Sequence, residues 1–419
     1  MQRLARSATI NVAANAASSA AQWLVVVIFA QAYGSQALGA YGLILAVVSP
    51  LFLFGGLNLR VLASSMPERA YDPAALMRLQ RLGIALAAGG ALGAAVLLQP
   101  RDGLSPGLWV AVVALKMVET AAEGRYGFLQ RAHQAWPIAV RKFVRAGTTV
   151  ALLFALARLA GWPPGPAMAG VFAGALAVSL LLDRWPVAKG GLARASRTGT
   201  GALLRMALFS GATAAVDALV IAVPRLGLGG ASLAAVGTFT VLVQIPMAGA
   251  VVVSGIGQAV ISRLRAARGR RAFLTLLACA YGAVGLLGLA GTVLASWWGE
   301  AFVHLLYGAD FAGAGALLPP VMWGGLAWYL AGMSGVGLQA RGRYGAQLAA
   351  TVAAVCAATV AMVLQPPTVQ GAVNAYLAAM LARLAVSTAA LIWIVAHWEG
   401  EAAVPGDCAE FRPEGRGPC

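Results

Sequence analysis

The sequence predicts an all-α integral membrane protein with about twelve transmembrane helices, arranged as two pseudo-symmetric six-helix lobes around a central cavity. Composition indicates the membrane class, because 60% of the 419 residues are hydrophobic and 11% are charged, whereas soluble domains average about 25% charged residues. The distribution of Lys and Arg predicts the number of spans. A short internal repeat predicts the two lobes.

Twelve apolar segments follow one another, each able to cross a bilayer as a helix of about 20 residues. They are 11–32, 38–58, 79–99, 105–124, 142–161, 165–182, 202–223, 233–259, 272–298, 315–339, 345–364 and 371–396. The first lacks a small-residue cleavage site before a polar mature domain, so we interpret it as a retained helix. We assign 1–190 to an N-terminal lobe, 191–398 to a C-terminal lobe and 399–419 to a disordered cytoplasmic tail.

The positive charges agree with this count. Of the 30 Lys and Arg residues, 25 fall on one side of the twelve spans, while Arg101, Arg158 and Arg225 fall on the other and Lys116 and Arg383 lie within spans. Because cytoplasmic loops are enriched in Lys and Arg, both termini are predicted to be cytoplasmic. Contact with anionic lipid heads of the bilayer explains the net charge of +16 without a nucleic-acid partner.

An internal repeat relates the second span to the eighth. Leu38-Gly-Ala-Tyr-Gly42 matches Leu233-Ala-Ala-Val-Gly237 at an offset of 195 residues, and mid-span prolines follow at Pro50 and Pro246. Proline removes an intrahelical hydrogen bond and kinks a helix, so the pair predicts two bent helices lining a common path. Ordinary tolerance of proline in membrane helices is the alternative.

A charged stripe crosses the fourth span. Lys116, Glu119 and Glu123 are spaced at i, i+3 and i+7 and fall on one helix face. An ionised group at bilayer depth costs several kcal/mol, so the stripe is expected to face a protein interior or an aqueous cavity. The sequence contains neither a nucleotide-binding Gly-rich loop nor clustered metal ligands, and we expect no cofactor and no metal.

Several short motifs carry a resemblance to a known family. They are the second span from Ala37 to Asn58-Leu-Arg60, Tyr126-Gly-Phe-Leu-Gln-Arg131, Val223-Pro-Arg225, Gly255-Ile-Gly-Gln-Ala259 with Arg263, and Leu305-Leu-Tyr-Gly308 followed by Asp310-Phe-Ala. Their ordered set resembles bacterial polysaccharide flippases of the multidrug/oligosaccharidyl-lipid/polysaccharide exporter superfamily, over most of residues 1–398. In that family an aromatic pair often follows Pro-Arg, where this chain has Leu226-Gly227.

The resemblance implies a flippase of the bacterial inner membrane that moves an undecaprenyl-pyrophosphate-linked oligosaccharide between leaflets for surface polysaccharide synthesis. A polysaccharide polymerase complex is a further expected partner, and the chain is expected to be a monomer. A pyrophosphate carries about two negative charges and needs cationic partners at bilayer depth. Lys116 and Arg383, one in each half, are the two candidates at mid-membrane.

Further candidates have two interpretations each. Arg145, with Arg141 and Lys142, could form a funnel for the anionic head or could set topology. Arg225, at the outer edge of the seventh span, is a further candidate contact for the anionic head, although the aromatic pair of the family does not follow it. Asn15 and Gln244 could bind sugar hydroxyls or hold helices together.

The acidic residues also have two interpretations. Asp217 is either a structural partner of Arg383 or Arg225, or a site for a coupling proton or sodium ion. Glu119 and Glu123 either neutralise Lys116 and Arg125 or exchange protons.

These features favour a secondary transporter that works by alternating access and needs no covalent chemistry. One alternative is a multidrug/toxin exporter of the same superfamily, whose cationic substrates prefer an acidic, aromatic cavity. The other is a membrane-embedded glycosyltransferase or ligase. Such an enzyme usually needs reactive side chains on a sizeable extramembrane loop, and the longest outer loop here, 299–314, is short.

Overall fold

The computed structural model describes residues 2–65, 73–98, 104–132, 134–182, 200–267 and 269–398, and these ranges contain helices but no strand. The helices are α1 (Gln2–Gly55), α2 (Leu59–Ser65), α3 (Pro73–Leu98), α4 (Pro106–Arg131), α5 (Ala135–Phe154), α6 (Pro164–Leu182), α7 (Thr200–Gly229), α8 (Leu233–Ala266), α9 (Arg270–Tyr307), α10 (Leu318–Ala340), α11 (Tyr344–Leu364) and α12 (Val369–Ala396). The predicted tail and the predicted lobe boundary at residue 190 lie outside the described residues.

Helix α1 contains two crossings, which brings the number of transmembrane helices to twelve. It is broken at Gly34, where φ is 75° and ψ is −173°, a conformation that glycine reaches without strain. The carboxylate of Asp310 occupies the space that a Cβ of Gly34 would need. Any other residue at this turn would therefore meet both backbone strain and a steric clash.

Eight helices in the described ranges are long and apolar enough to cross a membrane by length and composition alone. One of these segments, 51 residues long, extends over both parts of α1. Helices α4 and α5 are not in this group because they carry clusters of charged residues, and α10 is rich in Gly, Pro and aromatic residues. The all-α prediction with twelve transmembrane helices is confirmed.

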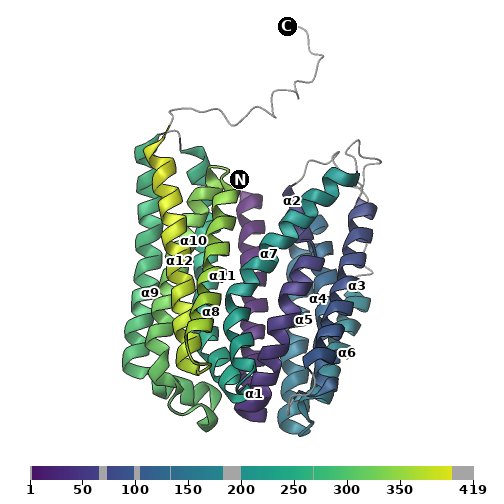
Figure 1. Cartoon of the computed structure of the whole chain (residues 1–419). Coiled ribbons are helices and arrows are strands. Elements are labelled where there is room, and N and C mark those ends of the chain that lie inside the picture. Colours follow the sequence, from purple (N-terminus) through teal and green to yellow (C-terminus); the bar gives the residue numbers. More distant parts are fainter. Residues whose placement is uncertain are drawn as a thin grey trace.

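The helices form two bundles. Helices α2 to α6 lie on one side of the molecule and α8 to α12 on the other, while α1 and α7 run between them (Figure 1). The beginning of α1 and the end of α12 lie at the same end of the molecule (Figure 1). We call this end the terminal side and the other end the opposite side.

The two lobes meet backbone to backbone on the opposite side. A Cβ on Gly39 would overlap the carbonyl of Leu233, and a Cβ on Gly237 would overlap the carbonyl of Ser35. Nearby, Gln31 donates a hydrogen bond to the carbonyl of Leu306 at 2.8 Å. Only glycine allows two helices to approach so closely. The repeated segments of α1 and α8 therefore hold the two lobes together on the opposite side.

Both prolines of the repeat lie inside continuous helices, Pro50 in α1 and Pro246 in α8. The Pro246 ring packs against Gly325 of α10, and its carbonyl accepts a hydrogen bond from the Tyr329 hydroxyl. Pro246 is therefore tied to the neighbouring helix. A role of the two prolines as hinges stays a prediction.

Candidate functional site

A cavity of about 620 Å³ lies in the N-terminal lobe, lined by the first six helices of the chain and by Met247 of α8. Six of its lining residues are charged: Arg60, Lys116, Glu119, Glu123, Lys142 and Arg145. Four cations face two carboxylates, so the lining has an excess of two positive charges. The lining on α1 includes Ser18 to Val25 in the first crossing and Tyr41 to Leu53 in the second, and it continues through Gly56 onto α2, which places the cavity between mid-membrane and the terminal side.

An unusual turn between α1 and α2 aims Arg60 into this cavity. Leu57 and Asn58 have positive φ values of 57° and 46°. Asn tolerates this region, whereas Leu rarely adopts it. Leu57 is buried, and Gly211 of α7 packs against its Cα. The fold thus imposes a strained turn beside the cavity, as is common at binding sites.

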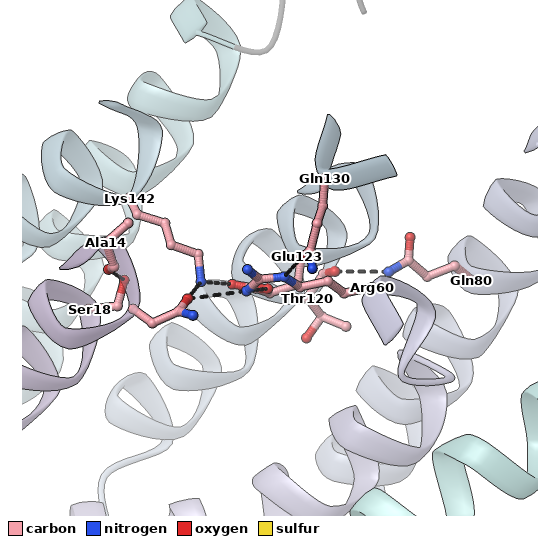
Figure 2. A network of polar contacts seen from close by, with 9 residues as sticks. Ala14, Ser18, Arg60, Gln80, Thr120, Glu123, Gln130 and Lys142 are labelled. Atoms are coloured by element: carbon pink, nitrogen blue, oxygen red, sulfur yellow. Dashed lines mark hydrogen bonds and ion pairs between the residues drawn. The ribbon is translucent and has the colours of Figure 1, made fainter. Parts of the chain in front are cut away.

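Glu123 is the centre of a polar network that joins four helices (Figure 2). Its carboxylate pairs with Arg60 of α2 at 3.0 Å and with Lys142 of α5 at 2.8 Å. Both cations also donate to the Asn15 side-chain oxygen of α1, Lys142 at 3.0 Å and Arg60 at 3.4 Å. Arg60 further donates to Gln130 of α4 at 3.1 Å. One carboxylate therefore faces two cations, and one positive charge of this group remains uncompensated.

A second pair lies deeper on α4. Lys116 Nζ approaches the Glu119 carboxylate to 2.8 Å, and both side chains are about a quarter exposed. The hydroxyl of Tyr41 interacts electrostatically with both groups and with Arg225. Tyr41 therefore links the cavity to the lobe interface.

Arg145 lines the cavity and donates to the Ser179 hydroxyl at 2.8 Å, while its Nε has no hydrogen-bond partner among the described residues. Lys142 and Arg145 both lie over the Tyr126 ring, 5.4 Å and 6.0 Å from its centroid, where a cation is attracted by the π-system. Arg141, by contrast, donates to the Leu182 carbonyl and is not among the lining residues.

The candidates of the C-terminal lobe lie away from this cavity. Arg383 of α12 pairs with Asp217 of α7 at 2.8 Å, with exposed side-chain fractions of 15% and 52%. Arg225 is 8% exposed, and its Nε has no hydrogen-bond partner in the described parts of the chain. Gln244 is half-buried and lines neither this cavity nor the smaller hollow between α8 and α10.

The structure thus brings together Lys116, Glu119, Glu123 and Arg145 but separates them from Arg383. In the structural interpretation Glu123 neutralises Arg125, two residues further along α4, whereas the structure pairs it with Arg60 and Lys142. From the sequence, Arg60 is one of the 25 Lys and Arg residues on one side of the spans, which set the orientation in the membrane. The same role in orientation is the favoured interpretation of Lys142. The sequence signal that could have identified Arg60 is the helix-breaking Gly55-Gly56-Leu-Asn58 run just before it.

In the described residues, no group of three or more His, Cys, Asp or Glu is arranged to hold a metal ion. The cavity lining offers charged, amide, hydroxyl and aromatic groups.

No protein-family model and no curated protein matches the sequence. Solved structures do resemble the chain. The inward-facing form of a multidrug resistance MATE family transporter of the MOP superfamily is 15% identical, with a TM-score of 0.68 over 90% of this chain and 93% of that one. An outward-facing form of such a transporter is 14% identical, with a TM-score of 0.67 over 94% and 95% of the two chains.

A third similar structure is a MOP superfamily transporter from Pyrococcus furiosus, for which a reverse polarity of the binding pocket is said to suggest a different function. It is 16% identical, with a TM-score of 0.67 over 94% of this chain and 95% of that one. At these identities the likeness establishes the fold, which is that of twelve helices in two lobes.

Proposed function

We propose that this chain moves an undecaprenyl-pyrophosphate-linked oligosaccharide, whose pyrophosphate is anionic, across a bacterial inner membrane by alternating access. The cation-rich cavity carries the proposal, since Arg60, Lys116, Lys142 and Arg145 outnumber Glu119 and Glu123 in its lining. The excess of two positive charges equals the charge of a pyrophosphate diester, about two negative charges at neutral pH.

The physical requirement is the replacement of water around the phosphates. An ionised phosphate taken out of water loses several kcal/mol of solvation unless charged donors replace it. Arg60 and Lys142 are well suited because they share one carboxylate and remain on the cavity wall. Arg145 has an unused Nε donor, and Arg offers a planar fork that matches phosphate oxygens.

The chain's own contacts suggest the order of events. In the described conformation the lobes are joined on the opposite side by Gly39 and Gly237, while the charged lining extends towards the terminal side. The anionic head would enter from the terminal side and the polyprenyl tail would remain in lipid. Separation of the two glycine-lined helices would then expose the head on the opposite side. Both inward-facing and outward-facing transporters have this fold, which supports a two-state motion.

Return of the empty carrier requires a driving force. Glu119 and Asp217 each pair with a single cation, so protonation of either would release Lys116 or Arg383. A proton or sodium gradient acting on one of these carboxylates is therefore the coupling mechanism that we propose.

Reconstituted vesicles can test the proposal. The probe is a short-chain polyprenyl-pyrophosphate disaccharide with a fluorescent label, and the readout is its appearance in the other leaflet. We expect the double variant Arg60→Gln and Lys142→Gln to lose transport while remaining folded and inserted in the membrane. The control Arg341→Gln removes a cation that stacks on Trp398 outside the cavity and should transport normally. Equal transport by the double variant and the control would overturn the proposal.

A second candidate function is export of organic cations. The similar structures include multidrug resistance transporters, and the cavity also contains two carboxylates. An organic cation would have to approach four positive side chains, which disfavours it by Coulomb repulsion. Transport of a fluorescent organic cation that depends on Glu119 and Glu123, with no movement of the glycolipid probe, would favour this second function.

A further inference from the structure

We propose that a second hollow, in the C-terminal lobe between α8 and α10, holds the uncharged sugar part of the cargo whose anionic head occupies the N-terminal cavity. This inference rests on the proposed function and extends it to a division of recognition between the lobes. The hollow has a volume of about 320 Å³. None of its lining residues is charged, whereas six residues of the first cavity are.

The two hollows share one face of α8. Met247 lines the first cavity, and Ala250, Ser254, Gln258 and Ile261 line the second. These positions follow one another at intervals of three, four, four and three residues, which places them on one stripe of a helix. The stripe therefore leads along α8 from the first cavity towards the second.

The chemistry of the second hollow is polar but neutral. Ser254 and Gln258 are exposed on α8, although they lie within a membrane-spanning helix. The Gln258 amide nitrogen reaches the Ser254 oxygen at 3.3 Å, so the two polar groups turn towards each other beside the hollow. Polar groups at this depth are costly in lipid. A water-filled or ligand-filled hollow removes that cost.

Aromatic rings and a further amide complete the lining. Trp328 and Tyr329 lie side by side, with ring centroids 6.3 Å apart. The Tyr329 hydroxyl is bonded to the Pro246 carbonyl and the residue is buried, so Trp328, which is partly exposed, supplies the ring that a ligand can contact. The Gln339 amide nitrogen donates to Gln347 at 2.8 Å, which leaves its carbonyl oxygen for another donor.

This combination selects the class of ligand. The lining of this hollow contains no cationic side chain that could pair with an anion, and no carboxylate that could pair with an organic cation. A sugar ring presents hydroxyl groups at its rim, which suit amides and a serine, and apolar C–H faces, which suit aromatic rings. The arrangement therefore fits a neutral saccharide attached to the anion in the neighbouring cavity.

Binding of two probes separates the roles of the two hollows. One probe is polyprenyl pyrophosphate alone, and the other carries a neutral disaccharide on the same lipid. We expect Gln258→Leu and Trp328→Leu each to weaken binding of the disaccharide probe roughly tenfold, which corresponds to about 1.4 kcal/mol, because each variant removes a hydrogen bond or a ring contact. The bare lipid should bind as tightly as to the unchanged protein. Trp328→Phe, which keeps a ring, should restore most of the lost affinity.

Two further variants complete the experiment. Lys142→Gln should weaken both probes equally, since it acts on the shared anionic head. Gln370→Leu makes the same Gln-to-Leu change outside both hollows and should change neither. Equal losses for both probes in Gln258→Leu and Trp328→Leu, or no loss in either, would overturn the sugar site while leaving the proposed function intact. Failure of the unchanged protein to bind either probe would instead overturn the proposed function itself.

Discussion

Neutralising Glu123 provides a quantitative test of the cavity. The substitution Glu123→Gln removes the carboxylate that pairs with Arg60 at 3.0 Å and with Lys142 at 2.8 Å. Breaking a buried ion pair by removing one partner costs about 3–5 kcal/mol. Here the cost is lower, because the Glu123 side chain is 43% exposed and Lys142, 8% exposed, keeps its bond to Asn15. We therefore expect a stability loss of about 2 kcal/mol.

The same change should strengthen the binding of an anion. In the unchanged protein an incoming phosphate competes with the Glu123 carboxylate for the same two cations. Two unit charges 4 Å apart interact by about 1 kcal/mol in water and about 4 kcal/mol near a protein surface. A gain of about 1.4 kcal/mol, within this range, corresponds to tenfold tighter binding. The measurement is titration of detergent-solubilised protein with short-chain polyprenyl pyrophosphate, together with a thermal unfolding curve.

The control is Glu300→Gln, which changes the net charge equally but affects a carboxylate that accepts from the Gly313 backbone outside the cavity. It should leave the affinity unchanged. If Glu123→Gln binds the anionic lipid more weakly than the unchanged protein, while Glu300→Gln does not, Glu123 does not compete with the cargo. The assignment of Arg60 and Lys142 to the anionic head would then be refuted.

Three other predictions concern the C-terminal lobe and the topology. Asp217→Asn should lower the free energy of unfolding by about 1–2 kcal/mol, because it leaves Arg383 unpaired, and adding Arg383→Gln should restore the protein level. A stable single variant that loses its response to an imposed pH gradient would instead identify Asp217 as the coupling carboxylate. Arg225→Met should raise the free energy of unfolding by about 1–4 kcal/mol, because it removes a buried guanidinium whose Nε has no hydrogen-bond partner among the described residues. A lower melting temperature of this variant would show that a compensating anion is bound. A reporter fused after Arg265 should be active only in the cytoplasm and one fused near Glu300 only outside; activity on the same side would contradict the twelve-span topology.

The helices could be predicted from sequence because each span is a long apolar run with recognisable flanks. The structure departs from the prediction where charges enter a helix. Helix α5 begins at Ala135 instead of 142, because Arg141 and Lys142 belong to its first turns and are buried by other helices. The predicted fifth span starts at Lys142 and leaves Arg141 outside it, whereas in the structure both residues lie within α5 and have polar partners on α6 and α1.

The cavity could be predicted only in part. The stripe of Lys116, Glu119 and Glu123 requires a polar face on α4 by helical periodicity alone. The partners Arg60 and Lys142 come from other helices, and no local pattern records which helix packs against α4. The expected meeting of Lys116 and Arg383 rested on their similar depth in the membrane. Two residues at the same depth can still lie far apart in the plane of the membrane, and Arg383 instead pairs with Asp217 of α7.

The contact that closes the opposite side also bears on the origin of the chain. It joins 38–42 to 233–237, the two copies of the repeat: Gly39 meets Leu233, and Gly42 meets Val236 and Thr240. A surface that meets its own copy is characteristic of twofold homodimers. A single six-helix unit carrying this segment would present one half of a self-complementary contact to a second unit. Covalent linkage of two such units would allow each half to change independently, and the two halves of this chain do differ, with a charged cavity in one and a neutral hollow in the other.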